Sequence, residues 1–145
     1  MKNKNKTNQM VELLVPCIEY SPQTFAHCIR VMKYALKHPL ADKCDAFELM
    51  VCALYHDLLE DTCIQIEDIV KITRLQTSRI EHTLNLLTQN PGESYIDYIK
   101  RLRYDPDNKM AYIIKLSDMK DHLLQKDTLT DKLKQKYFSV MADLL

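Results

Sequence analysis

The chain has 145 residues, with a single glycine, and its 20 Lys and Arg residues balance its 20 Asp and Glu residues. One glycine excludes the glycine-rich loops that cradle phosphate groups and disfavours folds rich in β-hairpins. A formal net charge of zero argues against a dedicated nucleic-acid binder, which is normally basic. Because no run of 18 apolar residues and no signal-type segment occurs, we expect a cytoplasmic protein without membrane contact.

The chain begins with a polar, low-complexity stretch, residues 1–8, which we predict to be a disordered tail. Residues 9–145 contain no linker and no internal repeat, and their length suits one domain with a real core. A short helix is predicted within 9–20, with Pro16 disturbing it or marking a new start. Helix formers such as Leu, Lys, Met and Gln are abundant, which favours an all-α fold.

The remaining helices are predicted from apolar residues at helical spacing and from residues that commonly cap helices. Ser21 and Asp45 precede two such segments, and Ser94 with Asp97 resembles a capping box. Asp105-Pro106 is interpreted as a cap followed by proline in the first helical turn. The predicted helices cover residues 22–37, 46–60, 66–73, 76–89, 95–103, 106–125 and 130–144. Short connections between them indicate a compact multi-helix bundle, and nothing in the pattern requires a strand.

The segment with the most chemical information is Tyr55-His56-Asp57-Leu58-Leu59-Glu60-Asp61-Thr62. On a helix, steps of three and four residues return to one face, so the ionisable side chains at 56, 57, 60 and 61 are expected to crowd together. Carboxylates in such a patch repel one another, and the preceding helix is strongly apolar. A divalent cation would relieve both the repulsion and the cost of burial.

Two more candidate ligands lie on other apolar helices, His27 upstream and Asp118 downstream. Imidazole together with carboxylate suits Zn, Fe or Mn. Each residue also has a purely structural interpretation, because a single His27 is more often a core histidine and Asp118 can pair with Lys115. The order and spacing of the four residues together favour a metal site over those separate explanations.

The pattern His … His-Asp … Asp on separate helices resembles that of the HD-domain metal-dependent phosphohydrolases. Residues 56–62, HDLLEDT, resemble the HDxxEDT motif of the hydrolase domains of RelA/SpoT-type stringent-response enzymes and their small stand-alone relatives. Residues 95–102 and 114–122 resemble the YxxYIxR and VKLADLxDN segments of those relatives. The resemblance covers about residues 20–125 and implies an all-α HD-domain bundle.

The resemblance also implies a role for each site residue. His27, His56, Asp57 and Asp118 would ligate one divalent ion, Mn²⁺ in this branch, with Fe, Zn or Mg as other choices. Glu60 and Asp61 would hold and deprotonate the attacking water. The substrate in this branch is ppGpp or pppGpp, cleaved at the 3′-pyrophosphate, and some relatives act on other nucleotides.

The nucleotide pocket departs from the resembled pattern at two places. The stretch before His27 lacks the family's Arg-Lys pair, and His122 occupies the position of the asparagine that contacts the sugar. Arg101 and Lys115, together with His122, are therefore the basic residues that we expect to contact an anionic substrate. Their alternative is an ordinary surface role, since charged side chains are mostly exposed.

Three functions follow from these observations. The first is a metal-dependent phosphohydrolase that cleaves a nucleotide, with ppGpp as the leading substrate. The second keeps the enzyme but makes it another nucleotide phosphatase or phosphodiesterase of the HD superfamily. The third is a non-catalytic nucleotide-binding module, which the water-activating pair Glu60 and Asp61 disfavours. The expected partner is a small phosphorylated nucleotide in each case, and the oligomeric state is left open.

Overall fold

A computed structural model describes residues 9–75 and 78–145, and within these ranges all regular structure is helical. The prediction of an all-α fold is therefore confirmed. The tail predicted at 1–8 lies outside the described residues, as do residues 76–77. The helical segments are 9–14, η1 (Pro16–Glu19), α2 (Pro22–Leu36), η2 (Ala41–Lys43), α3 (Ala46–Tyr55), α4 (Leu58–Asp61), α5 (Ile66–Thr73), α6 (Ser78–Leu86), α7 (Tyr95–Tyr104), α8 (Lys109–Leu124) and α9 (Asp131–Leu144).

Side-chain caps begin several of these helices where the sequence predicts them. The Ser21 hydroxyl accepts a hydrogen bond from the Thr24 amide at 3.1 Å, and Pro22 occupies the first helical turn. The Asp45 carboxylate and the Ser94 hydroxyl cap α3 and α7 in the same way. Each cap satisfies an amide that has no partner within the helix, which is why these starts are predictable.

Three predicted boundaries are wrong. The helix expected over 76–89 ends at Leu86. The helix expected over 46–60 stops at Tyr55, and a turn at His56 and Asp57 separates α3 from the short α4. The helix expected from Asp105-Pro106 begins at Lys109 instead. The Asp105 carboxylate accepts a hydrogen bond from the Asp107 amide at 2.8 Å and so closes a turn. An aspartate before proline fits both a cap and a turn, and here the turn forms.

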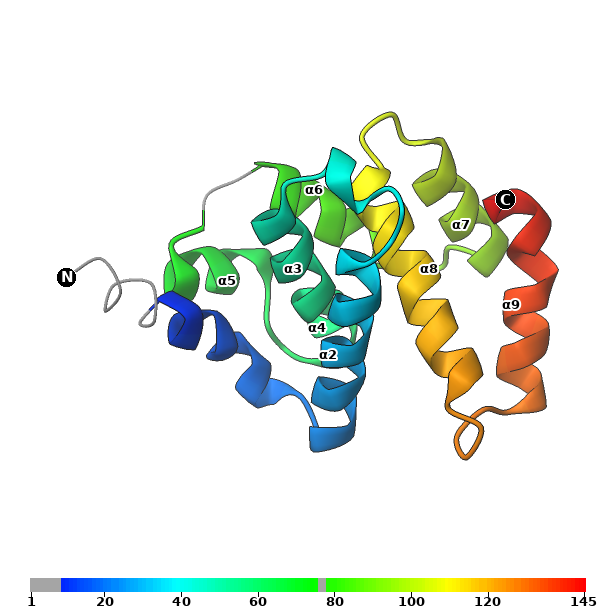
Figure 1. Cartoon of the computed structure of the whole chain (residues 1–145), viewed down its shortest axis with the longest axis horizontal. Helices are drawn as coiled ribbons and strands as arrows, with labels where there is room; N and C mark the ends of the chain where they lie inside the picture. Colours follow the sequence, from blue (N-terminus) through cyan, green and yellow to red (C-terminus); the bar gives the residue numbers. More distant parts are fainter. Residues whose placement is uncertain (1–8, 76–77) are drawn as a thin grey trace.

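Helix α2 lies at the centre of the fold and packs against both α3 and α8, which are far apart in the sequence (Figure 1). The contacts of α2 with α3 and α8 form part of the hydrophobic core, since Val31, Leu49 and Ile113 are fully buried. Helix α7 packs on α9, and both lie on the far side of α8 from α3 (Figure 1). This arrangement brings the middle of α2, the C-terminal end of α3 and the middle of α8 together.

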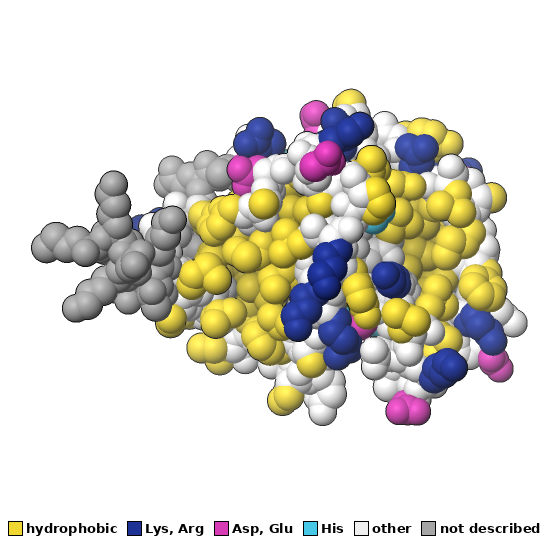
Figure 2. Space-filling view, in the orientation of Figure 1, with side chains coloured by type: hydrophobic (Ala, Val, Ile, Leu, Met, Phe, Trp, Pro, Cys, Tyr) yellow, Lys and Arg dark blue, Asp and Glu magenta, His cyan; other side chains and the backbone are white. Residues whose placement is uncertain are grey.

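Apolar side chains also remain on the surface. Hydrophobic side chains cover a broad part of the face in Figure 2, where a band of Lys and Arg side chains crosses them. Met10, Val11 and Ile18 of the N-terminal segment are among the most exposed apolar residues described. None of the helices within the described ranges has the length and apolar character needed to cross a membrane.

Candidate metal centre

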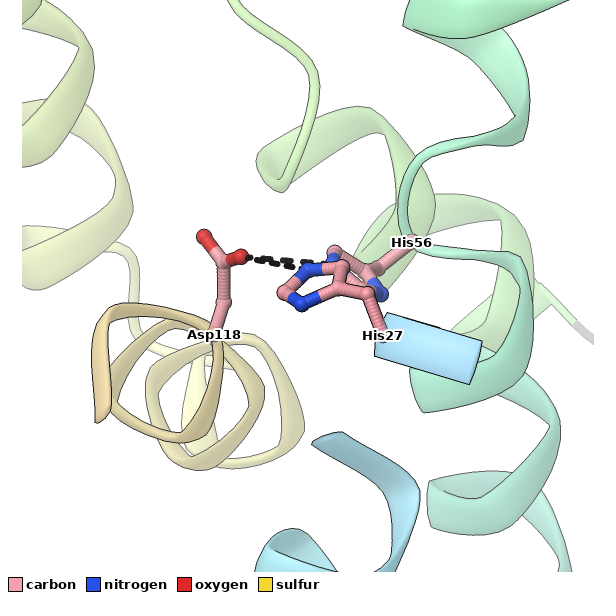
Figure 3. A group of neighbouring side chains, drawn as sticks. All are labelled: His27, His56 and Asp118. Carbon is pink, nitrogen blue, oxygen red and sulfur yellow. Dashed lines mark hydrogen bonds and ion pairs between the residues drawn. The ribbon is translucent and has the colours of Figure 1, made fainter. Parts of the chain in front are cut away.

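Three side chains converge where α2, α3 and α8 meet: His27 of α2, His56 directly after α3, and Asp118 of α8 (Figure 3). The carboxylate of Asp118 lies opposite the two imidazoles and points toward both (Figure 3). Its Oδ1 atom is 3.0 Å from Nε2 of His27 and 3.5 Å from Nε2 of His56. All three residues are buried, so the cluster is shielded from bulk water.

The orientation of His56 is determined by the backbone of the last turn of α3, which His56 directly follows. Its Nδ1–H donates a hydrogen bond to the Ala53 carbonyl at 2.7 Å. A carbonyl oxygen only accepts, so in the neutral ring the proton must be on Nδ1 and the lone pair on Nε2. That buried Nε2 atom has no hydrogen-bond partner among the described residues. An unpaired, buried lone pair that faces a carboxylate is typical of a metal ligand.

His27 is oriented by a hydrogen-bonded chain of charged side chains. Its Nδ1–H donates to Asp121 Oδ2 at 2.7 Å, and the Arg30 guanidinium donates two hydrogen bonds to the same carboxylate, at 2.7 and 3.0 Å. Asp121 is fully buried. A carboxylate behind a histidine fixes the ring and leaves Nε2 free for a metal. Sequence reasoning missed Arg30 and Asp121, although each lies one helical turn after a predicted ligand, His27 or Asp118.

Asp57 is the fourth predicted ligand, and it precedes α4 in the turn that breaks the expected helix. Its Oδ2 atom is 3.4 Å from Nε2 of His56 and 3.6 Å from Nε2 of His27. The turn therefore brings adjacent residues, His56 and Asp57, to one point, which a continuous helix would not do. The structure thus brings all four predicted ligands together.

The two predicted water-activating residues follow in α4. Glu60 Oε1 accepts a hydrogen bond from the Gln89 amide at 2.8 Å, which anchors that side chain to the loop before α7. Partial burial raises the pKa of the Asp61 carboxyl, and the negative charges of Asp57 and Glu60 raise it further. Both residues are exposed, so water reaches this edge of the centre.

Asp118 is surrounded by cationic or protonatable groups. Its Oδ2 atom is 3.0 Å from Nζ of Lys115, and its Oδ1 atom is 3.2 Å from Nε2 of His122. Burial alone would raise the pKa of Asp118, but Lys115 and the neighbouring imidazoles hold it well below its usual range. The carboxylate is therefore ionised, as a metal ligand must be. The structure places two predicted substrate contacts, Lys115 and His122, directly beside the cluster.

The two central imidazoles also respond to this negative charge. Burial lowers the pKa of His56, but Asp57 and Asp118 outweigh it and hold the pKa well above its ordinary value. In His27 the hydrogen bonds to Asp118 and Asp121 likewise outweigh burial and raise the pKa. The cluster therefore requires positive charge, either as protons on the rings or as a cation between them. Two imidazoles and two carboxylates are a suitable ligand set for a divalent transition metal.

Arg101 lies in a different environment from the one expected. Its guanidinium donates hydrogen bonds to both carboxylate oxygens of Glu93, at 2.8 and 2.9 Å, and to the Thr88 carbonyl at 2.8 Å. These bonds hold the loop between α6 and α7. Arg101 does not line the small cavity that borders the cluster, so its position supports a structural role.

Two cavities among the described residues differ in their relation to the cluster. The larger, about 710 Å³, lies beside the start of α3, α6 and the start of α8 and contains none of the predicted site residues. The smaller, about 60 Å³, borders the cluster directly. Its lining consists of His56, Asp57, Glu60, Leu87, Gln89, Tyr95, Tyr98, Lys115, Asp118 and Lys136.

Comparison with known families agrees with this geometry. A family model for the HD domain matches residues 24–123, well over half of the chain. The chain belongs to the HD-domain family. A search of curated proteins returned no match. The HD-domain superfamily comprises metal-dependent phosphohydrolases, and its members bind divalent metals. The matched range contains His27, His56, Asp57 and Asp118 and stops before α9.

Proposed function

We propose that this HD-domain protein is a nucleotide phosphohydrolase of the small stand-alone RelA/SpoT-type branch, which removes the 3′-pyrophosphate of ppGpp. One observation carries the hydrolase assignment. The Nε2 atoms of His27 and His56, with their Nδ1–H groups already donated elsewhere, converge on the carboxylates of Asp57 and Asp118. We assign these four residues as the ligands of one divalent ion, with Mn²⁺ as the proposed metal.

The metal, when bound, supplies Lewis acidity toward a water molecule and toward the phosphoryl oxygens. The protein would contribute the general base from α4. A raised pKa brings a carboxylate closer to the operating pH and makes it a better proton acceptor, which favours Asp61 for this role. Glu60, anchored by the Gln89 amide, would position the attacking water. The exposure of both residues provides the route by which water arrives.

The choice of ppGpp is supported by the resemblance of residues 56–62 to HDxxEDT and by the basic groups beside the cluster. Lys115 and His122 both contact Asp118, so an anionic substrate at the centre would lie within their reach. In this reaction water adds to the pyrophosphoryl group, and the 3′ oxygen leaves with a proton. GDP and pyrophosphate are the products.

A different nucleotide of the same chemistry is the second candidate. His122 replaces the asparagine of the resembled pattern, and its ring lies against His27, with 4.3 Å between the ring centroids. Arg101 is bound to Glu93. These two observations favour a nucleotide pocket that differs from that of the resembled enzymes, within the same phosphohydrolase mechanism.

The test is turnover of ppGpp by the purified protein loaded with Mn²⁺, with products separated by ion-exchange chromatography. Asp57→Ala should abolish turnover and lower the bound metal, whereas Asp42→Ala, at an exposed position in η2, should change neither. Turnover and metal content that survive Asp57→Ala would refute the assignment. A metal-loaded protein that releases no pyrophosphate from ppGpp but hydrolyses another nucleotide would support the second candidate. Tight nucleotide binding without any turnover would indicate a binding module.

A further inference from the structure

The small cavity beside the metal centre has walls of opposite charge. His56, Asp57 and Asp118 line one part of it, and Lys115 and Lys136 line another. A water molecule needs roughly 10–15 Å³ of such volume. The cavity, at about 60 Å³, therefore has room for a few water-sized groups, comparable with the three oxygens of one phosphoryl group and the oxygen that bridges it to the next.

The two lysines differ in how their charge is balanced. Lys115 Nζ lies 3.0 Å from Asp118 Oδ2 and is paired with it. Lys136, in α9, has no carboxylate within 4.0 Å of its Nζ among the described residues, and its ammonium group lies 4.2 Å from the centre of the Tyr95 ring. Partial burial lowers the pKa of Lys136, and the nearby charge of Lys115 lowers it further. An anion in the cavity would relieve this repulsion.

Tyr95 adds a donor to the same wall. Its hydroxyl is buried and has no hydrogen-bond partner among the described residues. Buried hydroxyl groups are normally paired, so an unpaired one indicates a missing partner. Tyr95 lines the cavity together with Lys136, and a phosphoryl oxygen would accept hydrogen bonds from both.

We propose that Lys136 and the Tyr95 hydroxyl bind the second phosphoryl group of a diphosphate ester whose first phosphoryl group reacts at the metal centre. The inference rests on the proposed function. The cavity shares His56, Asp57 and Asp118 with the metal cluster, so a group inside it is adjacent to the reacting phosphorus. Because Asp118 already balances Lys115, the free charge of Lys136 matches an additional anionic group. Lys136 thereby selects diphosphate esters over monophosphates.

The test compares inorganic pyrophosphate with inorganic orthophosphate as ligands of the full-length protein, loaded with Mn²⁺ and freed of excess metal. Isothermal titration calorimetry measures both affinities for the wild type, Lys136→Met, Lys136→Arg and Tyr95→Phe. A charge-assisted hydrogen bond at an exposed lysine accounts for about tenfold in affinity. Lys136→Met should weaken pyrophosphate binding by about that factor and leave orthophosphate binding unchanged. Lys136→Arg should restore most of the loss, because it keeps the cation.

Lys134→Met is the matched control, since Lys134 lies on the same helix and pairs with the exposed Asp131 at 3.6 Å. Its pyrophosphate affinity should equal that of the wild type. Tyr95→Phe should reduce pyrophosphate affinity in the same direction as Lys136→Met. Equal pyrophosphate binding by the wild type and Lys136→Met, or an equal loss for both anions, overturns the inference while the metal centre stands. A wild-type protein that binds no Mn²⁺ overturns the proposed function and this inference together.

Discussion

Replacing Asp121 by Asn tests whether the chain of Asp121 and Arg30 behind His27 prepares the metal centre. Asn has nearly the same shape as Asp, but it offers one acceptor oxygen where Asp121 uses two. Those two oxygens accept hydrogen bonds from Arg30 at 2.7 and 3.0 Å and from His27 Nδ1 at 2.7 Å. An amide that keeps its oxygen on Arg30 Nε turns its NH₂ group toward His27. The proton of the imidazole then moves to Nε2, the atom that faces Asp118.

The expected loss follows from that change of tautomer. Removing a carboxylate behind a metal-bound histidine costs roughly 10–100-fold in metal affinity, or about 1.4–2.7 kcal/mol. Asp121 is fully buried and carries three hydrogen bonds, so we expect Asp121→Asn near the upper end of this range. Titration calorimetry with Mn²⁺ measures the affinity, and ¹⁵N NMR of the histidine rings reports the tautomer.

Two other variants separate this effect from a loss of folding. Arg30→Met keeps the contact between Asp121 and His27 and should lower the affinity for Mn²⁺ less than Asp121→Asn does. Asp127→Asn, at an exposed position after α8, should bind metal as the wild type does. A folded Asp121→Asn protein with unchanged Mn²⁺ affinity and an unchanged His27 tautomer would refute the reasoning.

Three further predictions concern pH, the core and a turn. The raised pKa values of His27 and His56 mean that these two rings contribute stability to the metal-free protein. This contribution is fully present below about pH 6.5, the unfolded value, and is lost as pH rises through the folded pKa. The melting temperature of the metal-free protein should therefore fall between about pH 6 and about pH 9. At about pH 8, Mn²⁺ at 100 times its Kd should raise the free energy of unfolding by about 2.7 kcal/mol. A melting temperature that does not change with pH would contradict this. Ile113→Ala, at a fully buried position of α8, should cost about 2–5 kcal/mol in urea unfolding, and a loss below about 1 kcal/mol would show a core that closes around the gap. Gly92→Ala should cost about 1 kcal/mol because φ is +75° there, although no atom lies near the added Cβ, and a stabilised variant would show that the turn relaxes.

Local chemistry made most helix starts predictable. Ser21, Asp45 and Ser94 each cap the helix expected after them, because a short polar side chain bonds an amide only three residues away. The same local logic was wrong at Asp105, whose side chain closes a turn before α8. The predicted helix end was also wrong, because α3 stops at Tyr55. Apolar residues keep their helical spacing across the turn between α3 and α4, so spacing alone does not reveal where α3 ends.

The predicted site residues are a mixed case, because the metal ligands meet and one expected substrate contact does not join them. His27, His56, Asp57 and Asp118 were found from residue type, spacing and resemblance, and they do meet in the fold. Arg101 was expected near the substrate, but its charge is used by Glu93 in a loop. Basic side chains are long and common, so the sequence alone does not say which of them find an acidic partner.

The sequence by itself determined the all-α class, most helix starts and the set of candidate ligands, because these depend on backbone propensity and on the chemistry of single residues. Only the tertiary structure decided that Asp121 and Arg30 orient His27, and that Lys136 of α9 shares a cavity with Lys115. These relations join residues about 20 to 90 positions apart. They arise from the packing of α2, α8 and α9, and no local pattern of residues encodes a distance of that kind.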